Sequence, residues 1–324
     1  MLHHLVVPAS AAATRLDVWL ETQLDGCTRS LVTRLIKEGN CALMQGSQTL
    51  SSKAGYFLKG GEQVAIEVPE LEPMEAEPED IPLTVLHEDE HLVVIDKPAH
   101  MVVHPAVGHR RGTLVNALLG RYGQSLGGEP WRPGLVHRLD EDTSGVIAVA
   151  RTAASLAFLQ TAFRERQVGK RYLALVHGEP RADWLEHGGW IGRHPKDIRK
   201  RAIFPADSEG AKEAYTSVMV RQRCVGYAVV EARPRTGRTH QVRVHLAALG
   251  HAVLADRVYS RSDRWPLGAP DADPTALRRQ GLHAWALDLP HPAGGRLQIS
   301  APPPPDLARW LAKPLEPTPF AAKD

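Results

Sequence analysis

An acidic stretch broken by prolines divides the sequence into two parts of unequal length. Residues 70–82 alternate acidic side chains with Pro73, Pro78 and Pro82, and no basic residue offsets them. Because proline removes a backbone donor and like charges repel, this composition predicts a stiff linker that packs no core. We therefore expect a small module over residues 14–69 and a larger domain over residues 83–312.

The small module is predicted to combine two short helices with strands. Apolar residues at helical spacing predict a first helix, which contains Leu16, Trp19, Leu20 and Leu24. A second helix is expected to begin at Thr28 or Ser30 and to stop at Gly39. Short apolar segments over residues 41–44 and 64–68 lie on either side of glycine-containing turns and predict strands.

The larger domain mixes strands and helices without regular alternation. Apolar segments predict buried strands at 92–96, 146–150, 172–176 and 229–233. Apolar residues at helical spacing predict helices at 153–166 and 243–249. This order favours an α+β fold over a doubly wound one. After the proline run that begins at Pro302, we expect a short helix around 307–311 and a loose tail over 313–324.

The formal net charge of +2 conceals a partition of charge along the chain. Residues 1–69 are neutral, residues 70–96 carry −10, and residues 97–324 carry +12. Such asymmetry is typical of proteins that contact nucleic acid, although chance clustering of solvated surface charge would give the same figures. Charge alone leaves both interpretations open.

Other features narrow the class of protein. No apolar run approaches the ~20 residues that cross a bilayer, and no basic residue precedes the first apolar stretch, so neither a membrane protein nor a secreted one is expected. Three scattered cysteines fit a reducing cytoplasm. Phosphate-binding glycine loops and CxxC pairs are absent, and His240 and His245 lie five residues apart, so we predict no cofactor and no metal site.

The densest polar motif leads directly into an apolar strand. Residues 137–145 read HRLDEDTSG, and residues 146–150 are apolar. A loop that feeds a buried strand can hold a carboxylate rigidly and still leave it reachable, as a nucleophile or general base requires. The same residues could instead form a structural turn with a capping aspartate.

Basic clusters follow further along the chain. Residues 233–245 contain four arginines and two histidines without an acid, and Gly237 lies among them. Arginine suits paired contacts with phosphate, so this segment favours an anion site over a solvated basic face. Two further clusters occupy residues 164–171 and 193–201.

Several motifs together resemble one enzyme family. Three segments resemble the signatures of the RluA-type pseudouridine synthases: HRLDEDTSG at 137–145, KRYLALVHG at 170–178 and RTGRTHQVRVHLAALGH at 235–251. Two further segments resemble the sequences that flank these signatures in the family: VLHEDEHLVVIDKP at 85–98 and LHAWALDLPHP at 282–292. The small module resembles the alpha-L RNA-binding motif, and its presence favours the branch that modifies large-subunit ribosomal RNA. Two departures stand out, since His100 replaces a usual glycine and Met44-Gln45-Gly46 replaces a Val-Asn-Gly turn.

The resemblance implies a fold, a reaction and roles for three catalytic residues. It implies a central mixed, mainly antiparallel sheet flanked by helices and loops, and the isomerisation of uridine to pseudouridine after base flipping, without a cofactor. Asp140 would be the nucleophile or the charge-stabilising carboxylate, Arg243 would pair with it, and Tyr172 would stack on the uracil. Arg138 would fill the space that the flipped uridine leaves.

The resemblance also implies the surface that holds RNA. Besides Arg138, the residues expected to contact RNA are His137, Arg193, Lys196, Arg238 and His240 in the large domain and Arg29, Arg34 and Lys37 in the small module. The expected partner is large-subunit ribosomal RNA or its assembly intermediates, bound by a monomer in the cytoplasm.

Two other functions compete with isomerisation. A non-catalytic RNA-binding or assembly protein could keep the same fold, although it would not need Asp140, Tyr172 and Arg243 together. A nucleoside hydrolase would need a second acid to protonate its leaving group, for which Glu141 and Asp142 are candidates. Release of free uracil would distinguish hydrolysis from isomerisation.

Overall fold

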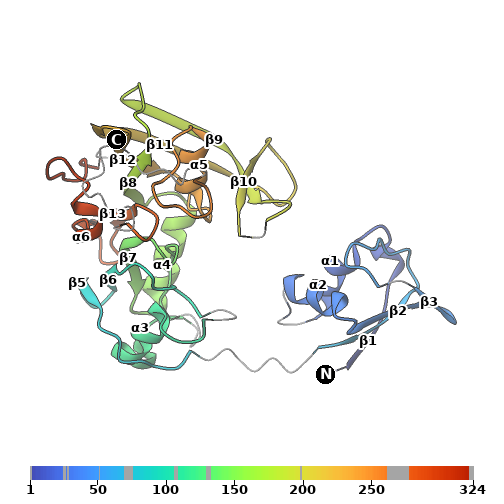
Figure 1. The fold of residues 1–324 in the computed structure, drawn as a ribbon. Helices are drawn as coiled ribbons and strands as arrows, with labels where there is room; N and C mark the ends of the chain where they lie inside the picture. Colours follow the sequence, from blue (N-terminus) through green and yellow to red (C-terminus); the bar gives the residue numbers. More distant parts are fainter. Residues whose placement is uncertain are drawn as a thin grey trace. The chain divides into compact units, whose positions relative to one another are not determined.

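The computed structural model describes residues 2–24, 27, 29–50, 52–68, 76–105, 109–128, 133–197, 199–260 and 277–320. The chain divides into two compact units, Met1–Met74 and Glu75–Asp324, which are treated separately below (Figure 1). None of the helices in these ranges has the length and apolar character needed to cross a bilayer.

The first unit is a four-stranded antiparallel sheet with two helices. Its strands lie in the order β1 (Leu2–Val6), β4 (Gln63–Glu67), β2 (Cys41–Gln45) and β3 (Gln48–Leu50). The helices are α1 (Leu16–Gln23) and α2 (Arg29–Lys37), preceded by the short helix η1 (Ala9–Ala11). One core joins the apolar faces of the helices to those of β2 and β4. The unit begins before residue 14, because β1 pairs with β4 although none of its side chains is fully buried.

The second unit is built on one ten-stranded sheet. Along the sheet the strands are β10 (Arg201–Phe204), β9 (Trp184–Arg193), β11 (Lys212–Cys224), β12 (Tyr227–Pro234), β8 (Gly169–His177), β13 (Leu282–Pro290), β7 (Ser144–Ala150), β6 (Leu92–Lys97) and β5 (Thr84–Glu88), with β14 (Arg296–Ser300) beside β13. Only the pair of β13 and β7 is parallel among these strands. The expected α+β fold with a mixed, mainly antiparallel sheet is confirmed.

The parallel pair brings two backbones unusually close together. Gly145 has a φ of 113°, and a Cβ atom there would lie 2.2 Å from the carbonyl oxygen of Ala284 on β13. Only glycine permits this approach. The final residue of the HRLDEDTSG motif is therefore needed where the loop joins the sheet.

Helices bury both faces of the sheet around β6 and β7. On one face, α3 (Leu114–Tyr122, followed by η2, Gly123–Ser125) packs against the alternate side chains Val93, Ile95, Ile147 and Val149. On the other face, α4 (Ala153–Arg164) packs against Leu92, Val94, Val146 and Ala148. Burial on both faces explains why β6 and β7 read as continuous apolar runs.

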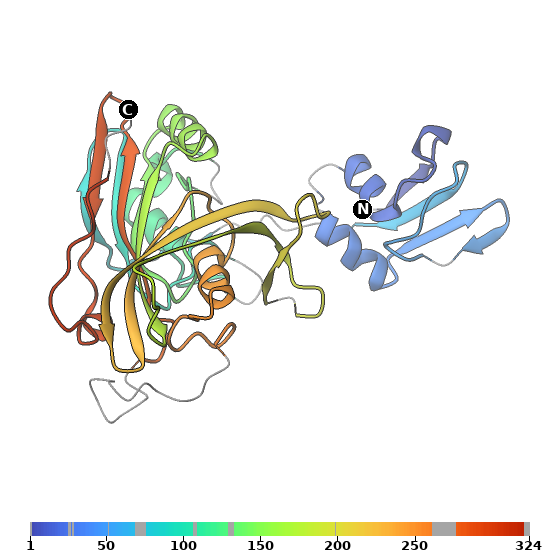
Figure 2. The same cartoon turned by 90° about the horizontal axis from the view of Figure 1, so that it is seen from above.

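A long arm and a short helix flank the other half of the sheet. The hairpin of β9 and β10, with the paired end of β11, extends beyond the rest of the sheet as a long arm (Figure 2). Helix α5 (Gln241–Ala248) packs on β8, β11 and β12 through Val242 and Leu246. The C-terminal segment contains α6 (Pro305–Ala308).

Part of the predicted linker is packed against the second unit. The backbone nitrogen of Glu79 donates to the carbonyl oxygen of Asn116 on α3, and the Asn116 amide donates to the carbonyl oxygen of Glu77. Ile81 packs against the core beside α3. The prediction of an unpacked linker is therefore wrong for residues 76–82, while residues 69–75 lie outside the described residues.

The prediction of a loose tail over residues 313–324 is also wrong for residues 313–320. The backbone nitrogen and hydroxyl of Thr318 donate to the buried carboxylate of Glu231, and the Arg171 guanidinium lies 4.3 Å from the ring centre of Phe320. The arginine Arg221 donates to the carbonyl oxygen of Glu316. Buried charge on the sheet holds the tail, and Leu315 also packs against the core formed by residues of β8, β12 and β13.

Candidate active site

The loop over residues 137–143 places Asp140 in a pocket at the end of β7. The Asp140 side chain is 21% exposed. The pocket is lined by residues of this loop, of β8 and of the segment between β12 and α5, and among them are Arg138, Asp140, Tyr172, Arg238, His240 and Arg243. The structure thus brings together six residues that the sequence analysis placed in the site, from three distant segments.

Arg243 lies between two carboxylates. Its Nη1 donates to Asp140 Oδ2 over 2.9 Å, while its Nε and Nη2 donate to the two oxygens of Asp256 over 2.7 and 2.9 Å. Asp256 is fully buried, and the backbone nitrogens of Val258 and Tyr259 donate to its Oδ1. Although burial alone would raise the pKa of Asp256, its bonds to Arg243 keep that pKa below the usual range. Asp256 therefore stays ionised and orients Arg243 toward Asp140.

Two buried basic side chains hold the backbone of the catalytic loop, and burial lowers the pKa of Lys97 to about 7. The ammonium group of Lys97, at the end of β6, donates to the carbonyl oxygens of Pro98, Met101 and Glu141 over 2.7–3.0 Å. Arg279 donates to the carbonyl oxygen of Asp142 over 3.0 Å. Both side chains are almost fully buried, so moving the loop would strand buried donors, at about 1–3 kcal/mol each.

Tyr172 contributes an aromatic ring to the pocket. It lies on β8, whose alternate residues face opposite sides of the sheet, and its neighbour Arg171 faces the tail instead. Burial, with the charge of Asp140, raises the pKa of the Tyr172 phenol well above its usual range. The side chain thus presents a neutral phenol beside Asp140.

His240 lies closer to Asp140 than a phosphate-binding role would require. Its Nε2 is 3.9 Å from Asp140 Oδ2, and its Nδ1 is 3.0 Å from the hydroxyl of Tyr259. The residue precedes α5 with a φ of 58°, in the left-handed region. Its ring is thus fixed by a neighbour and directed at the carboxylate.

His137 has a structural role, contrary to the prediction that it contacts RNA. Its Nε2 accepts a hydrogen bond from the backbone nitrogen of Ala148, and its ring stacks on Phe163 of α4 at 4.7 Å. Burial lowers the pKa of the imidazole to about 3, so the ring is neutral. A neutral ring that accepts from the backbone offers no charge to a phosphate, so we remove His137 from the RNA-binding set.

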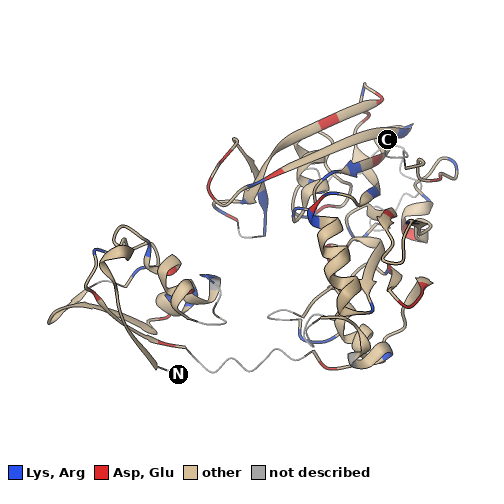
Figure 3. Cartoon of the chain, turned by 180° about the vertical axis from the view of Figure 1, so that it is seen from behind, with Lys and Arg blue, Asp and Glu red and all other residues tan. Residues whose placement is uncertain are grey.

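The other basic residues predicted to bind RNA lie in different places. Arg138 and Arg238 line the pocket, and the Arg238 side chain donates to the carbonyl oxygen of Glu213. Arg193 and Lys196 are exposed on the hairpin of β9 and β10 and do not line the pocket. Figure 3 shows basic residues at this hairpin. A second groove runs between the hairpin and α5 and includes His194, Lys200 and Arg201.

In the first unit, the predicted basic residues share α2. Arg34 and Lys37 are exposed, and Arg34 makes a long ion pair of 4.0 Å with Glu38. Arg29 instead binds the buried carboxylate of Asp17 over 2.8 Å, which Arg15 also contacts. Arg29 therefore joins α1 to α2, in addition to any contact with RNA.

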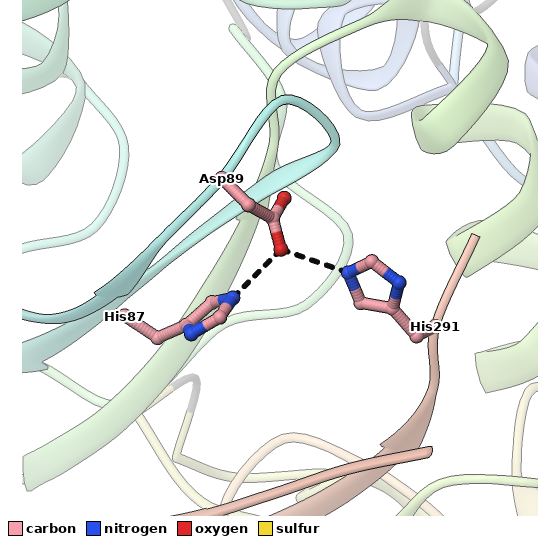
Figure 4. A group of neighbouring side chains, drawn as sticks. All are labelled: His87, Asp89 and His291. Atoms are coloured by element: carbon pink, nitrogen blue, oxygen red, sulfur yellow. Dashed lines mark hydrogen bonds and ion pairs between the residues drawn. The ribbon is translucent and has the colours of Figure 1, made fainter. Parts of the chain in front are cut away.

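One group of possible metal ligands lies away from the pocket. His87, Asp89 and His291 converge, and the Nε2 atoms of both histidines lie 2.7–2.8 Å from Asp89 Oδ2 (Figure 4). Residues 87–91, HEDEH, have the HExxH pattern, although the sequence predicted no metal site. On a helix this pattern binds zinc, but here it spans the end of β5 and a turn.

Hydrogen bonds account for the geometry of this group without an ion. The backbone nitrogen of Ala293 donates to Nδ1 of His291, which places the ring proton on Nε2, facing Asp89. A metal-binding imidazole needs the opposite arrangement. Asp89 Oδ1 accepts from the backbone nitrogens of His91 and Leu92, so the group ties the β5–β6 turn to the end of β13.

Three supporting residues were not assigned a role from the sequence. Asp256 orients Arg243, and Lys97 and Arg279 hold the loop, across separations of 44 and 137 residues. Lys97 lies within the quoted segment 85–98, and Asp256 lies five residues after the segment 235–251. Their buried positions indicate a function only when the partners are known. Neither Glu141 nor Asp142 lines the pocket, so among the described residues the pocket has no second carboxylate.

Comparison with known proteins agrees with this geometry. The family described as RNA pseudouridylate synthase matches residues 91–248. Two relatives named ribosomal large subunit pseudouridine synthase D are similar, from Xanthomonas campestris pv. campestris (41% identity, covering 96% of this chain and 92% of the relative) and Xylella fastidiosa (42% identity, 94% and 90%). The solved structure of human RNA pseudouridylate synthase domain containing 1 has a TM-score of 0.54 at 27% identity, covering 74% of this chain and 89% of that one.

Proposed function

The chain belongs to the RNA pseudouridylate synthase family, and we propose that it isomerises specific uridines of large-subunit ribosomal RNA to pseudouridine. Two of the relatives that cover most of its length are named as ribosomal large subunit pseudouridine synthases. The observation that supports the proposal most directly is the Asp140 carboxylate, paired with Arg243 beside the ring of Tyr172 in one pocket.

The reaction needs a carboxylate but no change of oxidation state. The N1–C1′ bond of the uridine breaks, the uracil turns, and a C5–C1′ bond forms; the C5 proton leaves and N1 gains a proton. In our proposal Asp140 attacks or stabilises the reacting centre, and Arg243 fixes its position and charge.

We assign Tyr172 to stacking on the uracil. A base that has left its helix loses its stacking partners, and aromatic side chains replace them. Because the raised pKa of Tyr172 keeps its phenol protonated, the ring is suited to stacking more than to removing the C5 proton.

The target uridine must leave the RNA helix before it can reach this pocket. Arg138 is exposed at the pocket and is our candidate for the side chain that fills the vacated space. Arg238 is proposed to hold nearby phosphates, and Arg193 and Lys196 are proposed to hold phosphates along the arm. These contacts position the RNA without reading its sequence.

The first unit is proposed to add affinity for RNA. Arg34 and Lys37 lie exposed on α2, and Arg29 is partly exposed beside them. We propose that a monomer binds ribosomal RNA or an assembly intermediate through both units, with the acidic residues 70–75 between them.

The test is the Asp140→Asn variant, assayed for pseudouridine in a large-subunit RNA fragment by carbodiimide labelling and primer extension. We expect the rate to fall by about 10³-fold or more while RNA binding persists. The matched control is Asp142→Asn, two residues away, whose carboxylate is 41% exposed and contacts His100 at the surface. A residual Asp140→Asn rate within about tenfold of wild type would contradict the assignment.

Free uracil should be measured in the same reactions. Isomerisation releases none, whereas a nucleoside hydrolase would release one uracil for each uridine consumed. Uracil release by the wild-type protein would replace our proposal with hydrolysis.

A further inference from the structure

We propose that His240 is a neutral hydrogen-bond donor that, together with Asp140, binds a hydroxyl group of the substrate ribose, and that Tyr259 determines which ring nitrogen carries the proton. The proposal rests on the proposed function, since it concerns the nucleotide that enters the same pocket. It replaces the phosphate-binding role that the sequence suggested for His240.

The hydroxyl of Tyr259 accepts one hydrogen bond and donates another. The backbone nitrogen of Arg201 lies 2.7 Å from the Tyr259 hydroxyl and can only donate to it. The hydroxyl proton remains available, and Nδ1 of His240 lies 3.0 Å away. Burial raises the pKa of Tyr259, so the phenol keeps its proton and donates it to Nδ1.

The hydrogen bond at Nδ1 determines which ring nitrogen of His240 carries the proton. Because Nδ1 accepts a hydrogen bond, the single proton of the neutral ring must lie on Nε2. Burial lowers the pKa of His240, although Asp140 and Asp256 oppose that effect and Arg243 and Arg201 add to it. The ring is therefore neutral at physiological pH and presents an N–H group from Nε2.

The distance from His240 Nε2 to the Asp140 carboxylate leaves room for one bridging oxygen atom. At 3.9 Å, Nε2 and Asp140 Oδ2 are too far apart for a direct hydrogen bond. An oxygen atom about 2.8 Å from both would bridge them. Such an oxygen must accept from Nε2 and donate to the carboxylate, which a hydroxyl does and a phosphate or a carbonyl oxygen does not.

The substrate offers such a group in its ribose. A ribonucleotide carries a 2′-hydroxyl that both donates and accepts, and this group distinguishes RNA from DNA. The hydroxyl is bonded to C2′, next to C1′, where the N1–C1′ bond is replaced by the C5–C1′ bond, so the hydroxyl must lie near Asp140. Recognition of the 2′-hydroxyl by His240 and Asp140 would hold the reacting sugar in place.

The backbone of His240 is consistent with a functional requirement. A φ of 58° is uncommon for a residue other than glycine and costs on the order of 1 kcal/mol or more. This conformation lies at the start of α5, one turn before Arg243. The fold thus holds His240 in a strained conformation beside the residue that pairs with Asp140.

Two substitutions of His240 differ in whether they place a hydrogen-bond donor at the position of Nε2. The amide of asparagine matches the position of Nδ1 and tolerates a left-handed backbone, but it does not extend to Nε2. The longer amide of glutamine extends to the position of Nε2 and can donate there. His240→Asn and His240→Gln are therefore a matched pair, in which only the second keeps a donor near Asp140.

The binding experiment uses RNA that carries pseudouridine, the product, at the modified position, so that no turnover occurs. Its dissociation constant is compared with that of the same RNA carrying 2′-deoxypseudouridine. We expect the wild-type preference for the ribose form to fall by about threefold to tenfold in His240→Asn and to stay within about twofold of wild type in His240→Gln. An unchanged preference in His240→Asn, or an equal loss in both variants, would overturn the proposal.

The tautomer is tested on the protein without RNA. In ¹⁵N NMR spectra, we expect the His240 ring to be neutral with its proton on Nε2, and in Tyr259→Phe to show a mixture of tautomers. Tyr122→Phe, which removes a hydroxyl bonded to Glu88 outside the pocket, is the control and should leave the His240 signals unchanged. A wild-type proton on Nδ1 would overturn the proposal whether or not the protein modifies ribosomal RNA, so the two claims can fail separately.

Discussion

Replacing Asp256 with asparagine tests whether catalysis depends on the carboxylate behind Arg243. Among the described residues, four atoms form hydrogen bonds to the Asp256 carboxylate, and all are donors: Nε and Nη2 of Arg243 and the backbone nitrogens of Val258 and Tyr259. An amide nitrogen placed at either carboxylate oxygen would therefore face a donor. The substitution leaves the shape of the side chain unchanged and removes both its charge and one acceptor.

The structure gives the size of the expected effect. Removing one partner of a buried ion pair costs about 3–5 kcal/mol when the other charge is left without compensation. Arg243 keeps its hydrogen bond to Asp140, so the loss of stability should lie near or below the lower end of that range. Arg243 would also lose the bonds that orient its Nη1 toward Asp140. A charge-assisted hydrogen bond is worth about 1.5–3 kcal/mol, so we expect the rate of pseudouridine formation to fall by roughly 10-fold to 150-fold.

Stability and rate should be measured together, by urea unfolding and by single-turnover modification of saturating RNA. The control is Asp288→Asn, because Asp288 on β13 makes a buried, paired contact with Arg296 at 2.9–3.2 Å but does not line the pocket. Both variants should lose stability, and only Asp256→Asn should lose rate in proportion to the misplacement of Arg243. If Asp256→Asn slows the reaction no more than Asp288→Asn does, the reasoning about Arg243 is refuted.

Two further predictions concern stability. Burial lowers the pKa of His245 and of His283 to about 4. Between pH 6.5 and pH 4 the unfolded chain therefore binds protons that the folded chain does not. The free energy of unfolding should fall as the pH falls through this range, by up to about 3 kcal/mol per histidine. Urea titrations should show a weaker pH dependence in His245→Gln, and an identical dependence would contradict this explanation. Deleting residues 313–324 should lower the free energy of unfolding by about 3 kcal/mol, because the bonds to Glu231 and Arg221 are lost. The rate of pseudouridine formation should stay nearly unchanged, because the tail lies on the face opposite Tyr172. A loss of rate without a loss of stability would contradict this prediction.

Local patterns in the sequence predicted much of the second unit. Continuous apolar segments identified β6, β7, β8 and β12 within a few residues, because these strands are buried on both faces. The same criterion could not identify β1, whose side chains alternate between exposed and half-buried positions. Its place is determined by pairing with β4, which begins 57 residues after the last residue of β1.

Errors in the predicted site have a common physical origin. His137 and Arg138 are adjacent in one motif, yet the first accepts from a strand behind the loop while the second lies exposed at the pocket. Nothing in the residue types indicates which way each side chain turns. The tail is a similar case, since backbone carbonyls of its residues accept from arginines more than 90 residues away.

The placement of charge around the catalytic loop suggests which component moves during the reaction. One arginine, Arg243, is sufficient to pair with the Asp140 carboxylate, yet Lys97 and Arg279 are also buried beside the loop and donate to its carbonyl oxygens. Those carbonyls carry no net charge, so the two side chains act chiefly on geometry. Because the loop cannot shift without breaking buried bonds, Asp140 is already positioned before RNA binds. The movements needed for base flipping must then be made by the uridine and by exposed side chains such as Arg138, while the Asp140 carboxylate keeps its position.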